Sequence, residues 1–209
     1  MKLVLVRHGE TEWNKLGKFQ GQRDIALNSR GLAQAKETAQ TVAHWQHSVV
    51  YSSPLSRTMQ VAHEISSISG NAVQQVPGLQ ELSLGDLEGV TGEEMRSGWP
   101  QVYAAWRDDP ATVGMPNGET LVELQNRVWN ALLELEKTHL QAETPDDMLI
   151  LVSHNFAIRS LIGKLLGMPL SNFHRMSLSL SSISTVEIDQ RGRRLTSYNS
   201  TSHLSPENR

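Results

Sequence analysis

Two histidines and two arginines stand out because each follows or begins a predicted element of secondary structure. Arg7 and His8 end one apolar run, His154 ends another, and Arg57 lies in the first turn of a predicted helix. Neutral imidazole is a good nucleophile toward phosphorus, and a guanidinium can hold phosphoryl oxygens with its planar fork. Each residue alone also fits a plain structural role, but together they indicate phosphoryl chemistry with His8 as the nucleophile.

An anion next to the two predicted helix starts would explain the residues found there. Arg57 is a cation near a helix N-terminus, where positive charge is mildly unfavourable. A phosphate docked there would remove that conflict, because free backbone N–H groups also point at it. His154 precedes another predicted helix, and as a cation it is expected to add a third positive group around the phosphate.

A leaving alkoxide needs a proton, and a carboxylic acid with a raised pKa can supply it. The stretch 79–89 contains three carboxylates, Glu81, Asp86 and Glu88, in an irregular and partly apolar setting. The residues themselves do not choose among the three.

Composition excludes several other classes of function. The 209 residues include no cysteine and carry a net charge of −3, so thiolate chemistry is excluded and binding to nucleic acid is not expected. No G-x-S-x-G, Walker or H-E-x-x-H motif is present, and we expect no metal and no cofactor. No apolar run reaches membrane-spanning length, and the N-terminus lacks a signal-peptide pattern, so a soluble cytoplasmic protein is expected.

The predicted elements alternate between strand and helix. Strands are predicted at 2–7, 49–53, 71–76 and 147–154, and a terminal hairpin is centred on residues 190–192. Helices are predicted from Ser29, after Ser53-Pro54, near 91–97 and 100–108, through 121–135, and over 156–167. This order predicts an α/β fold with a mainly parallel sheet, helices on both faces and an antiparallel edge.

Ligands of such sheets bind beyond the carboxyl ends of the strands, so both histidines are expected to face one crevice. We expect a single domain, 1–209, with a lid-like insertion at about 82–118 and a C-terminal tail at 198–209. Residues 204–209 are expected to fray.

Six stretches resemble, in order, the histidine phosphatase superfamily, also called the phosphoglycerate mutase-like family. They are "LVRHGETEWN" (5–14), "FQGQRDIALNSRGLAQA" (19–35), "YSSPLSRTMQVA" (51–62), "ELSLGDLEG" (81–89), "PNGETLVELQNRV" (116–128) and "LVSHNFAIR" (151–159). The resemblance covers nearly the whole chain and implies a three-layer α/β/α sandwich that works without a metal.

The resemblance also implies a role for individual residues. His8 matches the nucleophile that becomes phosphorylated, and Glu81 matches the proton donor that later activates water. The phosphate pocket is implied at Arg7, Arg57 and His154, with Asn14 and Gln20 as further phosphoryl contacts. Gly21 and the tail residue His203 are candidate substrate contacts.

Departures from the family pattern bear on the type of reaction and on the substrate. Asp108 and Asp109 lie where the mutases have a longer and more basic insertion, which favours a phosphatase over a mutase. The tail resembles that of metal-independent phosphoserine phosphatases, although Leu84 replaces a histidine of those enzymes. Asn155 stands where glycine is frequent, so the mouth of the site is expected to differ.

These features predict a phosphatase for a small phosphorylated metabolite, with phosphoserine as the leading candidate. A cofactor-dependent phosphoglycerate mutase and a non-catalytic phosphate-binding regulatory module are the alternatives. A homodimer, or a scaffold role as a dimer, also stays open.

Overall fold

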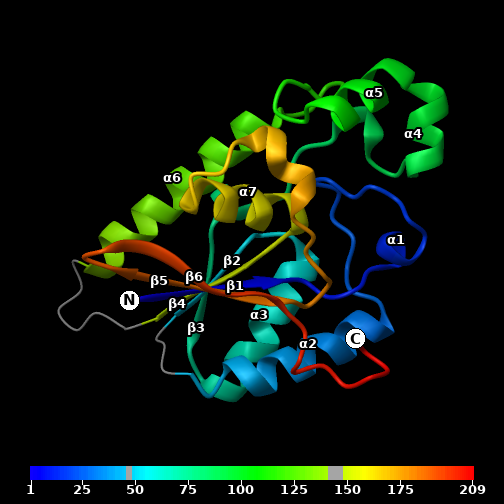
Figure 1. Cartoon of the computed structure of the whole chain (residues 1–209). Helices are drawn as coiled ribbons and strands as arrows, with labels where there is room; N and C mark the ends of the chain where they lie inside the picture. The colour runs from blue at the N-terminus through cyan, green and yellow to red at the C-terminus, as the bar shows by residue number, and fades with distance from the viewer. Residues whose placement is uncertain (46–48, 141–147) are drawn as a thin grey trace.

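A six-stranded mixed sheet forms the centre of the molecule (Figure 1). The computed structural model describes residues 1–45, 49–140 and 148–209. The strand order is β3-β2-β4-β1-β5-β6; the first four are mutually parallel, and β5 and β6 extend the sheet antiparallel. The strands are β1 (Lys2–Arg7), β2 (Val49–Ser52), β3 (Ala72–Gln75), β4 (Met148–Ser153), β5 (Ile183–Asp189) and β6 (Gly192–Ser200). The predicted fold class is confirmed; Asp147, expected to begin a strand, lies outside the described residues.

Helices cover both faces of the sheet and make a three-layer sandwich. Figure 1 shows α2 and α3 on one side of the sheet and α6 and α7 on the other, with α4 and α5 standing apart from the sheet. The helices are α1 (Glu12–Lys15), α2 (Ser29–Val42), α3 (Ser56–Ser69), α4 (Gly92–Gly98), α5 (Pro100–Asp108), α6 (Leu121–Leu140) and α7 (Asn155–Leu165). Three 3₁₀ turns complete the elements: η1 (Pro77–Leu79), η2 (Gly85–Leu87) and η3 (Leu170–Arg175). Segment 82–118 contains η2, α4 and α5, and its action as a lid stays a prediction.

The sheet divides the core in two because successive strand residues point to opposite faces. Leu3 and Leu5 of β1 join the cluster beneath α6 and α7, whereas Val4 and Val6 join the cluster beneath α2 and α3. All four side chains are almost completely buried. The continuous apolar sequence of β1 therefore reflects a central strand that is covered on both faces.

The helix predicted to open at Ser53-Pro54 begins two residues later, at Ser56, with Leu55 as its N-cap. Ser53 is therefore not the N-cap; its hydroxyl accepts from the N–H of Leu55 (3.4 Å) and lies 2.8 Å from Nε2 of His154. Arg57 still falls in the first turn.

The C-terminal tail is ordered, which corrects the expectation that residues 204–209 fray. Glu37 on α2 accepts hydrogen bonds from the backbone N–H and hydroxyl of Ser205 (2.8 and 2.7 Å) and from Nδ2 of Asn208 (2.8 Å). Figure 1 shows the tail running back beside α2. Polar side chains of the helix thus hold a segment whose own composition gives no sign of order.

Candidate active site

The carboxyl ends of three neighbouring strands bring the predicted residues together. Strands β2, β4 and β1 are adjacent, and the residues after them are Ser53, His154 and His8. A cavity of about 160 Å³ opens at this edge of the sheet. It is lined by Arg7, His8, Asn14, Lys18, Phe19, Gln20, Gly21, Arg57, Glu81, Leu84, Asn155 and Phe156.

His8 is held rigidly with one ring nitrogen available to the cavity. Its backbone N–H donates to the carbonyl of Ser153 (3.2 Å), and its carbonyl accepts from the N–H of Ser181 (3.0 Å). Nδ1 lies 2.7 Å from the carbonyl oxygen of Gly9, and because a carbonyl only accepts, Nδ1 carries the proton. Burial, followed by the charges of Arg57 and Arg7, holds the pKa of His8 well below its usual value. The ring is therefore neutral, with the lone pair on Nε2 free.

His154 is neutral, which corrects the expectation of a third cation. Nε of Arg57 donates to Nδ1 of His154 over 3.2 Å, and a guanidinium can only donate, so Nδ1 has no proton. Nε2 then donates to the Ser53 hydroxyl. Burial and the neighbouring Arg57 keep the pKa of His154 well below its usual value. The two imidazole rings pack edge-on with centroids 5.2 Å apart, so His154 helps to fix the orientation of the His8 ring.

Arg57 and Arg7 supply two positive charges at the cavity. Arg57 is fully buried, and its two terminal nitrogens donate to the carbonyls of Arg23 and Gly21 (2.8 Å each). Arg7 donates to the carbonyl of Leu178, and among the described residues its buried Nε has no partner. Burial lowers the pKa of both arginines to about 10, so both stay charged at neutral pH. Two fixed cations beside a small cavity make a site for a compact anion.

Glu81 is the carboxylate that the structure places at the cavity. Its Oε1 accepts from the N–H groups of Leu82 (2.9 Å) and Ala157 (3.1 Å), and its Oε2 accepts from the N–H of Phe156 (3.1 Å). Phe156 and Ala157 are in the first turn of α7, where N–H groups lack partners within the helix. Burial raises the pKa of Glu81, against the opposing effect of these bonds and of the arginines.

The other two candidate carboxylates have different partners. Asp86 accepts from Nδ2 of Asn117 (2.9 Å) on the surface. Glu88 accepts from the N–H of Gln22 (2.7 Å) and lies 3.7 Å from Nε of Arg23. Neither is among the residues that line the cavity, so position selects Glu81.

The loop that carries Glu81 is held by Arg127 of α6. The guanidinium donates to the carbonyls of Gly78 (3.1 Å), Gln80 (3.0 Å) and Glu81 (3.1 Å), and it pairs with Glu119 at 2.8 Å. This role of Arg127 could not be predicted from the sequence, because its three carbonyl partners are about fifty residues away.

We expect Arg127→Met to lower the free energy of unfolding by about 2 kcal/mol, since several carbonyls lose a charged donor. Urea denaturation measures this change, with the exposed Arg96→Met as the control. Arg127→Lys keeps the charge but not the planar fork, so it is expected to recover only part of the loss. Equal stability of Arg127→Met and Arg96→Met would contradict this role.

The two buried histidines predict a specific dependence of stability on pH. The unfolded chain binds protons on both as the pH falls through about 6.5, whereas the native state keeps both neutral to lower pH. The free energy of unfolding therefore falls as the pH falls below about 6.5, by up to about 1.4 kcal/mol per pH unit for each histidine.

The variant His8→Ala is expected to reduce the slope of the free energy of unfolding against pH by about 1.4 kcal/mol per pH unit, which corresponds to one proton. The variant His63→Ala, which removes an exposed histidine, serves as its control. Glu81, with its raised pKa, acts in the opposite direction, because its native state binds more protons than its unfolded state. The comparison of the two variants cancels that contribution. Identical slopes for His8→Ala and His63→Ala would exclude a buried neutral His8.

Three further predicted residues lie at the cavity and one does not. Asn14, Gln20 and Gly21 are among the lining residues; the backbone N–H of Thr11 donates to Oδ1 of Asn14 (3.1 Å), and the Thr11 hydroxyl donates to Oε1 of Gln20 (2.9 Å). His203 is not among the lining residues, and its Nε2 instead lies 3.1 Å from Oγ1 of Thr38 on α2. The structure therefore does not bring His203 to the site.

The cavity is also lined by residues for which the sequence predicted no role in the site. Lys18, Phe19 and Phe156 line it together with Leu84 and Asn155, which the sequence analysis noted only as departures from the family pattern. The ring of Phe156 stacks on Phe173 with centroids 5.5 Å apart. Of these residues only Lys18 lies outside the stretches that resemble the family, and the resemblance implied no role in the site for any of them.

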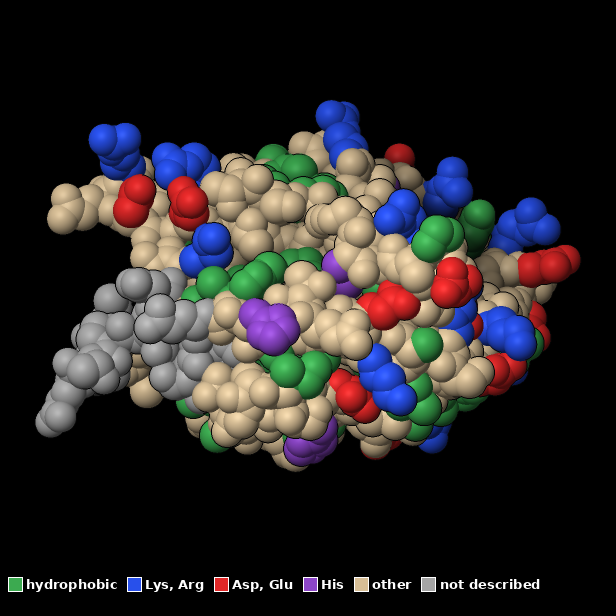
Figure 2. Space-filling model, turned by 90° about the horizontal axis from the view of Figure 1, so that it is seen from below, with side chains coloured by type: hydrophobic (Ala, Val, Ile, Leu, Met, Phe, Trp, Pro, Cys, Tyr) green, Lys and Arg blue, Asp and Glu red, His purple; other side chains and the backbone are tan. Residues whose placement is uncertain are grey.

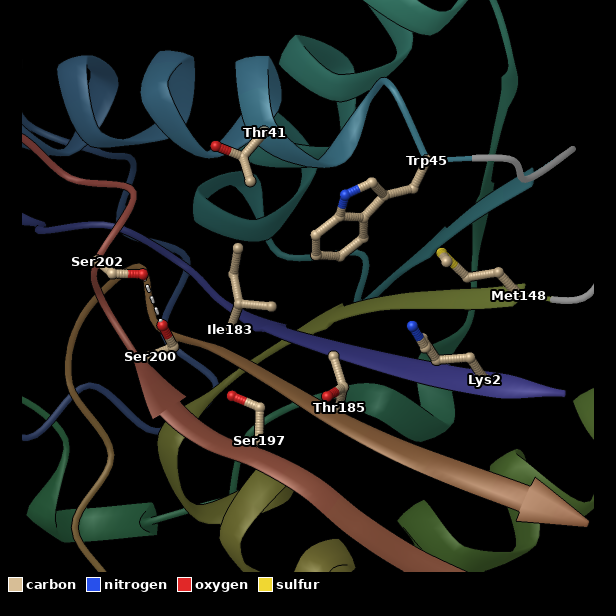
Figure 3. A pocket seen from close by; sticks show the side chains of 9 residues that line it. All are labelled: Lys2, Thr41, Trp45, Met148, Ile183, Thr185, Ser197, Ser200 and Ser202. Carbon is tan, nitrogen blue, oxygen red and sulfur yellow. Dashed lines mark hydrogen bonds between the residues drawn. The ribbon is translucent and has the colours of Figure 1, made fainter.

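A larger cavity, of about 490 Å³, lies between α2 and the strands β1 and β5 (Figure 3). Figure 3 shows Trp45 and Ile183 facing each other across it, with Met148 and Lys2 at one end. The remaining lining residues are serines and threonines, and none of the predicted site residues is among them. It lies on a face of the sheet and not at the carboxyl ends of the strands, so its size alone does not make it the catalytic site.

The surface and the side-chain clusters add three observations. Figure 2 shows lysine and arginine side chains interspersed with aspartate and glutamate on the face beneath the sheet, so no broad basic field covers that face. Within residues 1–45, 49–140 and 148–209, no three His, Cys, Asp or Glu side chains are grouped to hold a metal ion. In the same ranges, no helix has the length and apolar composition that a membrane crossing requires.

Comparison with known proteins places this geometry in a family. Residues 3–201 match the model of the histidine phosphatase superfamily (branch 1). The chain is 34% identical to phosphoserine phosphatase 1 of Hydrogenobacter thermophilus over 98% of this chain and 94% of that protein. It is 35% identical to the glucosyl-3-phosphoglycerate phosphatase of Mycolicibacterium vanbaalenii over 82% and 77% of the two chains. A solved phosphoserine phosphatase variant from Entamoeba histolytica, in complex with phosphoserine, is similar with a TM-score of 0.81 and 32% identity, covering 98% of this chain and 99% of the other.

Proposed function

This chain belongs to branch 1 of the histidine phosphatase superfamily and is a phosphatase, and on that premise we propose that it hydrolyses small phosphomonoesters through a phosphohistidine on His8. The observation that carries the proposal is a neutral, buried His8 whose Nε2 is free at a cavity with two fixed arginines. Glu81 is the proposed proton donor, and Arg7, Arg57, Asn14 and Gln20 are the proposed phosphate contacts.

In the first step, Nε2 of His8 attacks phosphorus in line with the leaving oxygen. The P–N bond forms as the P–O bond to the substrate breaks, and Glu81 gives its proton to the leaving oxygen. The raised pKa of Glu81 suits this task, because a larger fraction is protonated near neutral pH. Arg7 and Arg57 stabilise the charge on the equatorial oxygens without having to move.

In the second step, water replaces His8 on phosphorus. Glu81, now a carboxylate, accepts a proton from the water as its oxygen bonds to phosphorus. The P–N bond breaks and its electron pair returns to Nε2, which leaves a neutral His8 and inorganic phosphate. His154 stays neutral behind His8 and contributes through Arg57, whose Nε it binds.

Phosphoserine is the first candidate among the substrates. The support is the 34% identity to a phosphoserine phosphatase over 98% of this chain, together with the likeness to the phosphoserine complex from Entamoeba histolytica. Lys18 lines the cavity and can pair with a substrate carboxylate. The relative that acts on glucosyl-3-phosphoglycerate makes other phosphorylated metabolites the competing candidates.

Release of inorganic phosphate from a panel of phosphorylated metabolites tests the proposal. We expect phosphoserine to give the highest kcat/KM and a chelator to leave the rate unchanged. Phosphate release from another metabolite at a much higher kcat/KM would reject phosphoserine but keep the mechanism. Conversion of 3-phosphoglycerate into 2-phosphoglycerate without free phosphate would instead establish a mutase.

A further inference from the structure

Gln34 is a buried amide on α2 with both of its functional atoms bonded. Its Oε1 accepts from the backbone N–H of Glu10 over 2.8 Å, and its Nε2 donates to the carbonyl of Asn208 over 2.7 Å. The side chain is 3% exposed. The first partner can only donate and the second can only accept, so the orientation of the amide is fixed.

The peptide bond between Gly9 and Glu10 connects Gln34 to His8. The carbonyl of this peptide is the acceptor for Nδ1 of His8 (2.7 Å), and its N–H is the donor to Gln34. A peptide unit is planar, so its C=O and N–H turn together. A rotation that weakened the bond to Gln34 would also turn the carbonyl away from His8.

We propose that Gln34 is a positioning residue for the nucleophile, acting through the Gly9–Glu10 peptide to keep the proton of His8 on Nδ1. The inference deepens the proposed function, because it concerns the histidine that attacks phosphorus. Successive hydrogen bonds through one peptide unit also polarise one another, which strengthens the bond to His8. Nε2 is thereby left free and aimed at the cavity.

The close contact between this loop and α2 leaves the peptide little freedom. A Cβ atom built at Gly9 would lie 2.7 Å from the carbonyl oxygen of Gly31 and 3.0 Å from Oε1 of Gln34. Glu10 is further tied to the start of α2, where its Oε1 accepts from Nδ2 of Asn28 (2.8 Å). Glycine at position 9 therefore permits the approach that Gln34 needs.

The C-terminal tail completes the arrangement. Asn208 supplies the acceptor for Gln34, and Asn208 is itself held by Glu37 one turn further along α2. Figure 1 shows the tail beside this helix. The tail thus acts as a second support for the nucleophile, although none of its residues lines the cavity.

The test compares Gln34→Leu with Gln40→Leu, a substitution of an exposed glutamine on the same helix. We expect Gln34→Leu to lower kcat per folded molecule by about 10- to 100-fold, with KM changed by less than about threefold, since geometry and not binding is lost. In ¹⁵N-histidine NMR spectra, the Nδ1-protonated form of His8 should lose population relative to wild type. Gln34→Met, which is unbranched, is the second variant if leucine does not fold.

Unchanged kcat and an unchanged His8 tautomer in the folded variant would overturn the proposal. A loss of kcat with the wild-type tautomer population would do the same. The tautomer of His8 can be measured by NMR whether or not the enzyme turns over. If the wild-type protein releases no phosphate, the proposed function is rejected, and the effect of Gln34 on the His8 tautomer is still tested by the NMR spectra. Glu37→Ala should lower kcat and the population of the Nδ1-protonated form of His8 by smaller amounts than Gln34→Leu does. If neither quantity changes, the tail does not support the nucleophile.

Discussion

His8→Ala is expected to lower kcat by about 10⁴-fold or more, because the variant lacks the nitrogen that bonds to phosphorus. The arginines remain, so KM for the substrate should change far less than kcat. Release of inorganic phosphate from phosphoserine and from an aryl phosphate measures both parameters. His63→Ala removes an exposed histidine of α3 and should retain wild-type rates.

The loss is expected without unfolding. His8 is fixed mainly by backbone bonds to Ser153 and Ser181, and these persist when the side chain is truncated. Circular dichroism and the urea midpoint establish that the variant is folded before the rates are compared. Turnover of the folded His8→Ala protein within about tenfold of wild type would exclude His8 as the nucleophile.

Glu81→Gln is expected to show an effect that depends on the leaving group. An alkoxide such as that of serine needs a proton as it leaves, so kcat should fall by about 10²- to 10⁴-fold. The nitrophenolate of p-nitrophenyl phosphate leaves readily without a proton, so the loss in the first step should be much smaller. The glutamine oxygen can still accept from the N–H groups of Leu82 and Ala157, which limits disturbance of α7, whereas the N–H of Phe156 loses its acceptor.

Glu93→Gln, at an exposed position of α4, is the matched control and should match wild type on both substrates. Single-turnover measurements separate formation of the phosphoenzyme from its hydrolysis, in which Glu81 acts as a base. Equal losses for the alkyl and aryl substrates in the first step would contradict a proton-donor role for Glu81.

Local patterns were sufficient to predict most of the fold. The apolar run of β1 and the alternation of strands with helices predicted a mainly parallel sheet, and the terminal hairpin predicted its antiparallel edge. Strand ends then placed His8 and His154 together, since the carboxyl ends of parallel strands share one edge. The four-residue helix α1 escaped prediction because its only signal is a Thr11–Asn14 capping box in a polar loop.

Protonation could not be predicted from residue types. His154 was expected to add a positive charge beside the phosphate, yet Arg57 donates to its Nδ1 and the ring is completely buried. Both facts depend on distant segments meeting. The residue types alone likewise did not identify Glu81 as the proton donor over Asp86 and Glu88; only the resemblance to the family did. In the structure, Glu81 alone of the three lines the cavity, where the N–H of Phe156 at the start of α7 donates to it.

Long-range contacts explain the remaining differences. Gln34 is a polar residue on a helix, and its two hydrogen-bond partners, Glu10 and Asn208, come from distant segments that meet only in the folded chain. The same return carries His203 to Thr38 and away from the cavity. Arg127 is one of several arginines in the sequence, and its importance follows from three carbonyls that a loop presents to α6.

The most direct test of the central claim is to trap the phosphoenzyme. Rapid mixing with substrate, quenching in alkali and mass spectrometry of the peptide 8–15 should show one phosphoryl group on His8 within a single turnover. The group should be lost in acid, and it should accumulate in Glu81→Gln supplied with an aryl phosphate. A phosphoryl group on another residue, or turnover with no phosphoenzyme and with inversion at phosphorus, would contradict the account.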